Sequence, residues 1–230
     1  MWAILSGIEG NLTAFQAVLR DIQTLNIEQL YILGDLVGIN PDSEKVVQRI
    51  RYPHADELSP QVCRGWWEEQ CIILHGLVAT GEPTELEVQY GAETAKKLWD
   101  SVSSETVKWL AALEFGFVEL DCLLIHGSTV SVSEELTPKT SPWQILDRLQ
   151  RMEVNHLFCG RSGEVFDYEL QAGSIATTVT TLDSQHLPQT MTTAQKRLIG
   201  VGSVGRKPPK ATYTLYNPYT NGVEFRTVYY

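Results

Sequence analysis

Side chains that can bind metal ions or transfer protons follow several short apolar runs of this sequence, at the points where those runs end. Glu9 follows the first run, Asp35 follows the second, and His126 and Arg161 follow later ones. Carboxylates and imidazoles are common ligands of divalent metals, whereas a guanidinium is a permanent cation. The residue types therefore indicate either an active site with unusual ligands or the remains of a metal site.

The elements that must position these residues alternate between strands and helices. Residues 2–5 and 29–33 are short apolar runs typical of buried strands, and residues 12–25 repeat apolar side chains at helical spacing after a capping Asn11. A third strand is expected at 71–74. This order predicts a parallel sheet, and ligand sites collect at the carboxyl ends of parallel strands. We therefore expect the candidate residues to meet at one edge of the sheet.

The second half of the chain is richer in strands and turns than the first. The patterns predict one domain over residues 1–230, with a helical insertion at about 76–114 that is interrupted at Gly91. The remaining expectations are a loop at 52–68, a hairpin of 117–120 with 122–125, a helix at 142–152, and strands at 156–159, 165–170, 174–181, 197–201, 211–216 and 223–229.

Composition excludes several classes of protein. The formal net charge of -10 argues against general binding to nucleic acid or to anionic membranes. No apolar run approaches the roughly 20 residues that span a bilayer, and the first residues form no leader, so we expect a cytoplasmic protein. The basic cluster of Arg206, Lys207 and Lys210 is interpreted as a solvated loop.

The cysteines and one histidine give no metal signature. None of the four cysteines forms a C-x-x-C pair, and three of them lie in or beside apolar runs, as buried thiols in a reducing compartment do. His156 has no convergent partner in the sequence and is interpreted as a surface or edge residue.

Three stretches resemble the calcineurin-like metallophosphoesterases, in particular their compact bacterial branch. They are "GDLVGINPD" at 34–42, "LLIHGS" at 123–128 and "VGSVGRKPPKATYTLY" at 201–216. Members of that family carry D-x-H-G-N-x-x-A, then L-G-D-x-V-G-x-x-P-D, and later G-N-H-[DE], H-G and G-H-T-H. The resemblance implies an α/β fold, a four-layer αββα sandwich of two mixed sheets flanked by helices. It also implies a site for two divalent metals at the strand ends.

The sequence departs from that family at most of the seven positions that the resemblance implies as metal ligands. Asp35 and His126 keep the ligand type, although His126 is equally typical of a hydrogen-bonded core histidine, the interpretation we favour. The replacements are Gly7 and Glu9 for D-x-H, the stretch at about 75–78 for G-N-H-[DE], and Arg161 and Gly163 for the two histidines of G-H-T-H. Each ion of a two-metal site needs several fixed donors. We therefore expect no cofactor, or at most one ion such as Mn²⁺ or Zn²⁺ on Asp35, His126 and Glu9.

We call Glu9, Asn11, Asp35, His126 and Arg161 the relic site. An uncompensated buried carboxylate costs several kcal/mol, and the guanidinium fork matches carboxylate geometry. The sequence therefore suggests that Arg161 pairs with Asp35, Glu9 or both in place of metal ions.

Three functions remain open at this point. The first is an inactive phosphoesterase-like protein that binds another protein, for which the small phosphoesterase-like subunit of retromer is a precedent. Trp66 and Trp67 are adjacent, so one of them is expected to be exposed and to mark the partner surface. The second is a diverged hydrolase with one metal or none. The third is a phosphate or nucleotide binder that uses Arg161.

Overall fold

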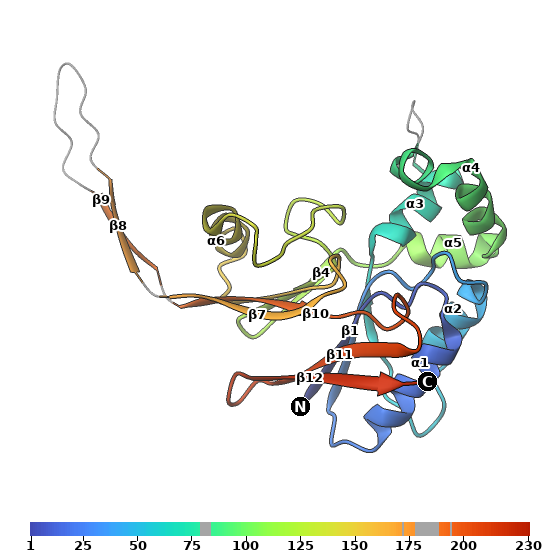
Figure 1. Cartoon of the computed structure of the whole chain (residues 1–230), viewed down its shortest axis with the longest axis horizontal. Coiled ribbons are helices and arrows are strands. Elements are labelled where there is room, and N and C mark those ends of the chain that lie inside the picture. Colours follow the sequence, from blue (N-terminus) through green and yellow to red (C-terminus); the bar gives the residue numbers. More distant parts are fainter. Residues whose placement is uncertain (79–83, 172, 178–188, 194) are drawn as a thin grey trace.

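Two mixed five-stranded sheets form the centre of the protein (Figure 1). The computed structural model describes residues 1–78, 84–171, 173–177, 189–193 and 195–230. The strand order of the first sheet is β12-β11-β1-β2-β3, and that of the second is β4-β5-β6-β10-β7. Strands β1, β2 and β3 run parallel to one another, as do β5, β6 and β10.

The first sheet and the helices near it come mainly from the amino-terminal half. Their bounds are β1 Trp2–Leu5, α1 Leu12–Gln23, β2 Gln29–Leu33, α2 Ser43–Arg51, β3 Gln61–Cys63, α3 Trp66–Leu74, α4 Glu85–Asp100, α5 Ser104–Ala111, β11 Lys210–Asn217 and β12 Gly222–Tyr229. The second sheet and its surroundings contain β4 Gly116–Glu119, β5 Cys122–Ile125, α6 Pro142–Gln150, β6 His156–Cys159, β7 Val165–Leu170 and β10 Lys196–Val201, with a separate pair β8 Gly173–Thr177 and β9 Gln189–Thr193.

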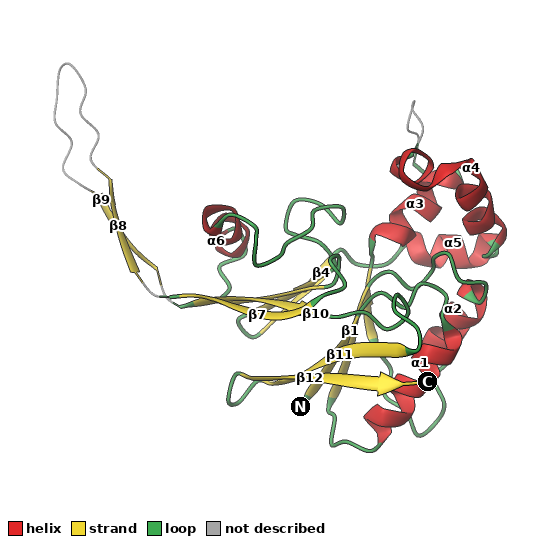
Figure 2. Cartoon of the chain, in the orientation of Figure 1, coloured by secondary structure: helices red, strands yellow, loops and turns green. Residues whose placement is uncertain are grey.

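Alternating side chains of the strands divide the core into layers. In β1, Ala3 and Leu5 join the apolar cluster shared with α1 and α2, whereas Trp2 and Ile4 join the cluster between the two sheets. The far face of the second sheet packs on α6. Figure 2 shows the helices on the outside of the sheets. The four-layer αββα arrangement that the resemblance implies is therefore confirmed.

Helix α3 corrects two of our predictions. The apolar residues 71–74 belong to this helix and form no strand, because a short apolar run is compatible with either structure. The third parallel strand is β3, within the range predicted as a loop. Trp66 and Trp67 are both buried, so neither marks a surface. Their rings contact each other and Tyr90 of α4, because neighbouring elements cover more than one face of α3.

Most other predicted elements are found near their expected positions. The helical segment is interrupted at Gly91, whose φ of 80° breaks α4. Residues 178–181 of the predicted strand 174–181 lie outside the described residues, and β8 and β9 extend away from the two sheets in Figure 1. Every described helix is too short or too polar to cross a bilayer.

The burial of Trp66 gives a first prediction. Trp66→Ala is expected to lower the free energy of unfolding by about 3–5 kcal/mol, because a fully buried indole leaves a cavity. Trp99→Ala, at a site 45% exposed, is the matched control and should cost less than about 1 kcal/mol. Urea unfolding of both variants checks this, and equal small losses would contradict the burial of Trp66.

Candidate functional site

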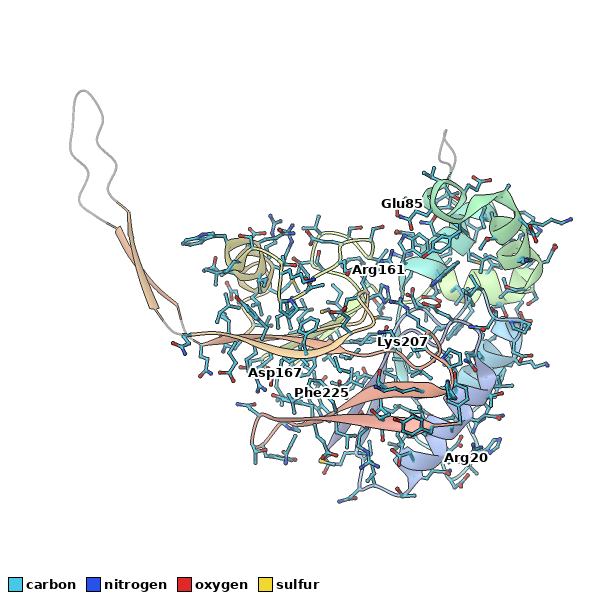
Figure 3. All side chains as sticks on the ribbon, in the orientation of Figure 1. Arg20, Glu85, Arg161, Asp167, Lys207 and Phe225 are labelled. Carbon is cyan, nitrogen blue, oxygen red and sulfur yellow. The ribbon has the colours of Figure 1, made fainter. Side chains whose placement is uncertain are left out.

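Loops from both sheets meet at the carboxyl ends of the parallel strands. Backbone hydrogen bonds join them: Gly7 N–H donates to Gly34 O at 3.3 Å, Gly160 N–H to His126 O at 2.8 Å, and Val204 N–H to Ser6 O at 3.0 Å. Arg161, labelled in Figure 3, lies at this edge, where the sheets approach the helices α3 and α4. The predicted edge therefore exists, and it also includes the loop that follows β10.

Asp35 lies at the centre of this edge and is fully buried. Its Oδ1 accepts a hydrogen bond from Trp67 N–H at 2.9 Å, and its Oδ2 accepts one from Arg206 Nη2 at 2.7 Å. Asp35 and Glu9 both have left-handed backbones, with φ of 56° and 50°. Such strained residues persist only where their surroundings fix them, and they cluster at functional sites.

The cation that pairs with both acids is Arg206. Its Nε donates to Glu9 Oε1, its Nη2 to Asp35 Oδ2, and its Nη1 to the Arg161 carbonyl at 2.8 Å. The Arg206 side chain is 20% exposed, and Glu9 and Asp35 are buried. The prediction that Arg206 belongs to a solvated loop is wrong, although Lys207 beside it is exposed.

Arg161 does not make the ion pairs predicted for it. Its guanidinium carbon lies 4.6 Å from the centre of the Trp66 ring, a cation–π contact. No carboxylate among the described residues forms a salt bridge with it, and its Nε is buried without a hydrogen-bond partner. The motif position located the backbone of Arg161 correctly, but the side chain extends toward α3.

Two glycines at former ligand positions line the Arg206 guanidinium. A Cβ added to Gly163 would lie 2.7 Å from Arg206 Nη1, and one added to Gly7 would lie 3.4 Å from Arg206 Nε and 2.8 Å from Ser203 Oγ. Both glycines also have positive φ. Arg206 therefore occupies space into which larger side chains at these positions would extend.

The charge of this guanidinium and the charges of the two acids affect one another. Burial raises the pKa of Glu9, Arg206 lowers it, and nearby Asp35 raises it again, with a net shift upward. Burial alone would lower the pKa of Arg206, but Asp35 and Glu9 together raise it. Arg206 therefore stays charged and stabilises the ionised form of Glu9.

His126 is fully buried and presents one nitrogen to the site. Its Nδ1 lies 2.7 Å from the Leu33 carbonyl, which can only accept, so Nδ1 carries the proton. Burial lowers the pKa of His126 more than Asp35 raises it, so the ring is neutral. Its Nε2 lone pair lies 3.3 Å from Asp35 Oδ1 without a hydrogen-bond partner.

Glu68 is a site residue that the sequence analysis missed. Its fully buried carboxylate accepts hydrogen bonds from the backbone N–H groups of Asp35, Leu36, Val37 and Gly65 at 2.7–3.1 Å. Burial, and then the charge of Asp35, raise its pKa to about 7. Residues 65–68 follow β3, so they take the place of G-N-H-[DE] that we assigned to 75–78. The signal available in the sequence was the glycine at the start of this stretch, Gly65, and the acid at its end, Glu68.

Asn11 lies at the rim of the site, where it has a structural role. Its Oδ1 accepts from Ala14 N–H and caps α1, and its Nδ2 donates to Tyr230 Oη at 2.8 Å and to Gly205 O at 3.3 Å. The structure therefore brings all five relic residues to one edge. It joins Glu9 and Asp35 through Arg206, which replaces Arg161 in that role.

These residues do not fit a two-metal centre. Glu9 Oε1 and Asp35 Oδ2 both accept hydrogen bonds from Arg206, and Gly7 and Gly163 supply no donor. Among the described residues, one group of three donors lies within 4.8 Å of one another, and it consists of Asp121, Cys122 and His156, far along the strands from Asp35.

Comparisons with known proteins agree with the fold. No family model matches the sequence. An uncharacterized protein of Methanocaldococcus jannaschii is 41% identical over 51 residues, which is 22% of this chain and 21% of that protein. The chain therefore matches only about a fifth of the length of that curated relative.

Two of the solved structures that resemble this protein superpose over the whole of the chain. A metallophosphoesterase from Sphaerobacter thermophilus superposes with a TM-score of 0.69 at 18% identity, over 88% of its own length. A hypothetical protein from Pyrococcus horikoshii gives 0.73 at 23% identity, over 89% of its length. With its two mixed sheets and flanking helices, this chain has the calcineurin-like metallophosphoesterase fold.

Proposed function

We propose that this chain is a metallophosphoesterase-like protein that has lost binuclear-metal hydrolysis and acts as a protein-binding or scaffold subunit. The observation that carries the proposal is the guanidinium of Arg206, which binds Asp35 and Glu9 in the space beside Gly7 and Gly163. A fixed cation of the chain thereby satisfies the buried carboxylates that metal ions would otherwise bind.

Hydrolysis by two metals needs an arrangement that these residues oppose. Two ions roughly 3.5–4 Å apart must hold the attacking and leaving oxygens. Here a dication would have to displace Arg206 from both acids, and it would face a second fixed cation, Arg161, which contributes to lowering the pKa of His126. The geometry therefore favours binding over catalysis.

A protein-binding role needs a surface other than Trp66 and Trp67. Helix α4 presents Val88, 77% exposed, together with the half-exposed Tyr90 and Trp99. The Trp99 ring stacks on His75 with a centroid distance of 4.0 Å. Exposed aromatic side chains are enriched where proteins bind each other, so we propose that the partner binds at these residues.

The proposed location is the cytoplasm, where thiols stay reduced, and four buried free cysteines support it.

A hydrolase with a single metal is the second candidate, and one observation favours it. His126 Nε2 has an unpartnered lone pair 3.3 Å from Asp35 Oδ1, so two donors already lie together. Glu9, the third predicted ligand, would have to leave Arg206.

The third candidate, a phosphate or nucleotide binder, is supported only by the unpartnered Nε of Arg161.

Metal content and turnover test the proposal. Because too few donors remain at the strand-end edge, the purified chain dialysed against Mn²⁺ should hold no ion whose binding depends on Asp35, so the chain and its Asp35→Asn variant should hold equal amounts. It should also hydrolyse neither an aryl phosphate nor a cyclic phosphodiester above background. Arg206→Ala should not restore turnover, because Gly7 and Gly163 still supply no ligand. Turnover that requires Mn²⁺ and disappears in Asp35→Asn would overturn the proposal and support the hydrolase.

The stability of an Arg206 variant tests the internal cation itself. Arg206→Met should lower the free energy of unfolding by about 3–5 kcal/mol, because it leaves two buried carboxylates without a cationic partner. Arg151→Met, which removes an exposed pair with Asp147, is the matched control and should cost at most about 1 kcal/mol. Urea unfolding measures both. A loss for Arg206→Met no larger than that of the control would show that the ion pairs do not support the site.

The same variant should show a defined pH dependence. Without Arg206, burial and Asp35 still raise the pKa of Glu9. A carboxyl whose folded-state pKa exceeds its unfolded value stabilises the protein at low pH and loses that contribution as pH rises. The destabilisation by Arg206→Met should therefore be larger at pH 8 than at pH 5. The opposite trend would show that Arg206 does not hold Glu9 ionised.

A further inference from the structure

Three donors of different chemistry converge at the edge of the second sheet opposite the relic site. Cys122 begins β5 and His156 begins β6, and the parallel register pairs these two residues directly. Asp121 lies in the turn between β4 and β5. His126 follows the other end of β5, so the two clusters are separated by the length of that strand.

Two of the three distances within this cluster, both of them hydrogen-bond contacts, are close to those of a tetrahedral metal site, and all three donor atoms lie within 4.8 Å of one another. His156 Nδ1 lies 3.2 Å from Asp121 Oδ1, and Cys122 Sγ lies 3.8 Å from the same oxygen. Bonds of about 2.0–2.3 Å at a tetrahedral angle place nitrogen and oxygen about 3.3 Å apart, and sulfur and oxygen about 3.6 Å apart. We propose that Asp121, Cys122 and His156 bind one transition-metal ion of the Zn²⁺ type, with water as the fourth ligand.

Neighbouring side chains hold the three donors in place. Asn155 Nδ2 donates to Asp121 Oδ2 at 3.0 Å, which leaves Oδ1 facing His156 and Cys122. The backbone N–H groups of Asn155 and His156 both donate to the Asp121 carbonyl. Tyr216 Oη lies 3.6 Å from Cys122 Sγ. Supporting hydrogen bonds of this kind orient metal ligands in known sites.

Access and donor type determine which ion would bind. The side chain of Asp121 is 48% exposed, whereas Cys122 and His156 are buried, so an ion would enter past the carboxylate. Two cations lie nearby and act electrostatically on the donors, although their hydrogen bonds go to other groups: Lys196 donates to Val154 O, and Arg197 pairs with Asp167. One sulfur, one nitrogen and one oxygen favour Zn²⁺ or Co²⁺ over Mg²⁺ or Ca²⁺. Burial raises the pKa of the Cys122 thiol to about 11, so the bound ion would displace its proton.

Cobalt spectroscopy of the full chain tests this site, since Co²⁺ reports both thiolate ligation and tetrahedral geometry. The chelator-treated protein titrated with Co²⁺ should gain a thiolate-to-cobalt absorption in the near ultraviolet and visible bands of a tetrahedral ion, and Zn²⁺ should remove both. Cys122→Ser should lose the thiolate band. Asp121→Asn and His156→Gln should weaken Co²⁺ binding at least about 10-fold. Asp56→Asn and His54→Gln, at exposed residues outside both clusters, are the matched controls and should leave the spectrum unchanged.

Two results would overturn the site. One is the absence of a thiolate band at millimolar Co²⁺. The other is a band that persists in Cys122→Ser or disappears in Asp56→Asn. If Cys122→Ser does not fold, Asp121→Asn decides the question, because it keeps the side-chain shape. We expect Zn²⁺ to raise the Tm of the unsubstituted chain and to leave the Tm of Asp121→Asn unchanged. An equal rise in Tm for both proteins would refute the proposal. The test is independent of the proposed function.

Discussion

The strand-end edge of this protein depends on the contacts of one guanidinium. Arg206, on the loop after β10, binds Glu9 after β1, Asp35 after β2, and the carbonyl of Arg161 after β6. Loops of both sheets are therefore joined through a single positive group. Metal ions would do the same in the family that the sequence resembles, but they could leave, whereas Arg206 is covalently part of the chain.

A second buried acid makes this arrangement possible. The backbone of Asp35 is left-handed, a conformation that costs about 1–3 kcal/mol and persists only where surrounding interactions fix it. Glu68 holds it by accepting three N–H groups of residues 35–37 and one from Gly65. These hydrogen bonds to Glu68 thus fix the shape of the turn that contains Asp35. Asp35 remains aimed into the site, where it needs a cation, and Arg206 is that cation.

The sequence predicted where the site lies better than which side chains meet there. Alternating strands and helices placed Glu9, Asp35, His126 and Arg161 at one edge, because parallel strands share their carboxyl ends. Arg206 was missed because its position depends on β10 lying beside β6, a long-range pairing that no local pattern shows. Trp66 and Trp67 were misjudged because helical periodicity cannot reveal that neighbours cover more than one face of α3.

The two ends of β5 illustrate how local electrostatics, more than donor count, determines where a cation can bind. At the carboxyl end, His126 Nε2 and Asp35 are good donors, but Arg206 already binds Asp35 and Glu9, and it and Arg161 both lower the pKa of His126. At the amino end, Arg197 pairs with Asp167, Lys196 donates to a backbone carbonyl, and Asp121 is open to solvent. A divalent ion would therefore have to displace Arg206 at the edge that the family motifs indicate, whereas it would meet an accessible carboxylate at the opposite edge. The surroundings of each donor thus favour the site that we propose at Asp121, Cys122 and His156 over the position that the family motifs indicate.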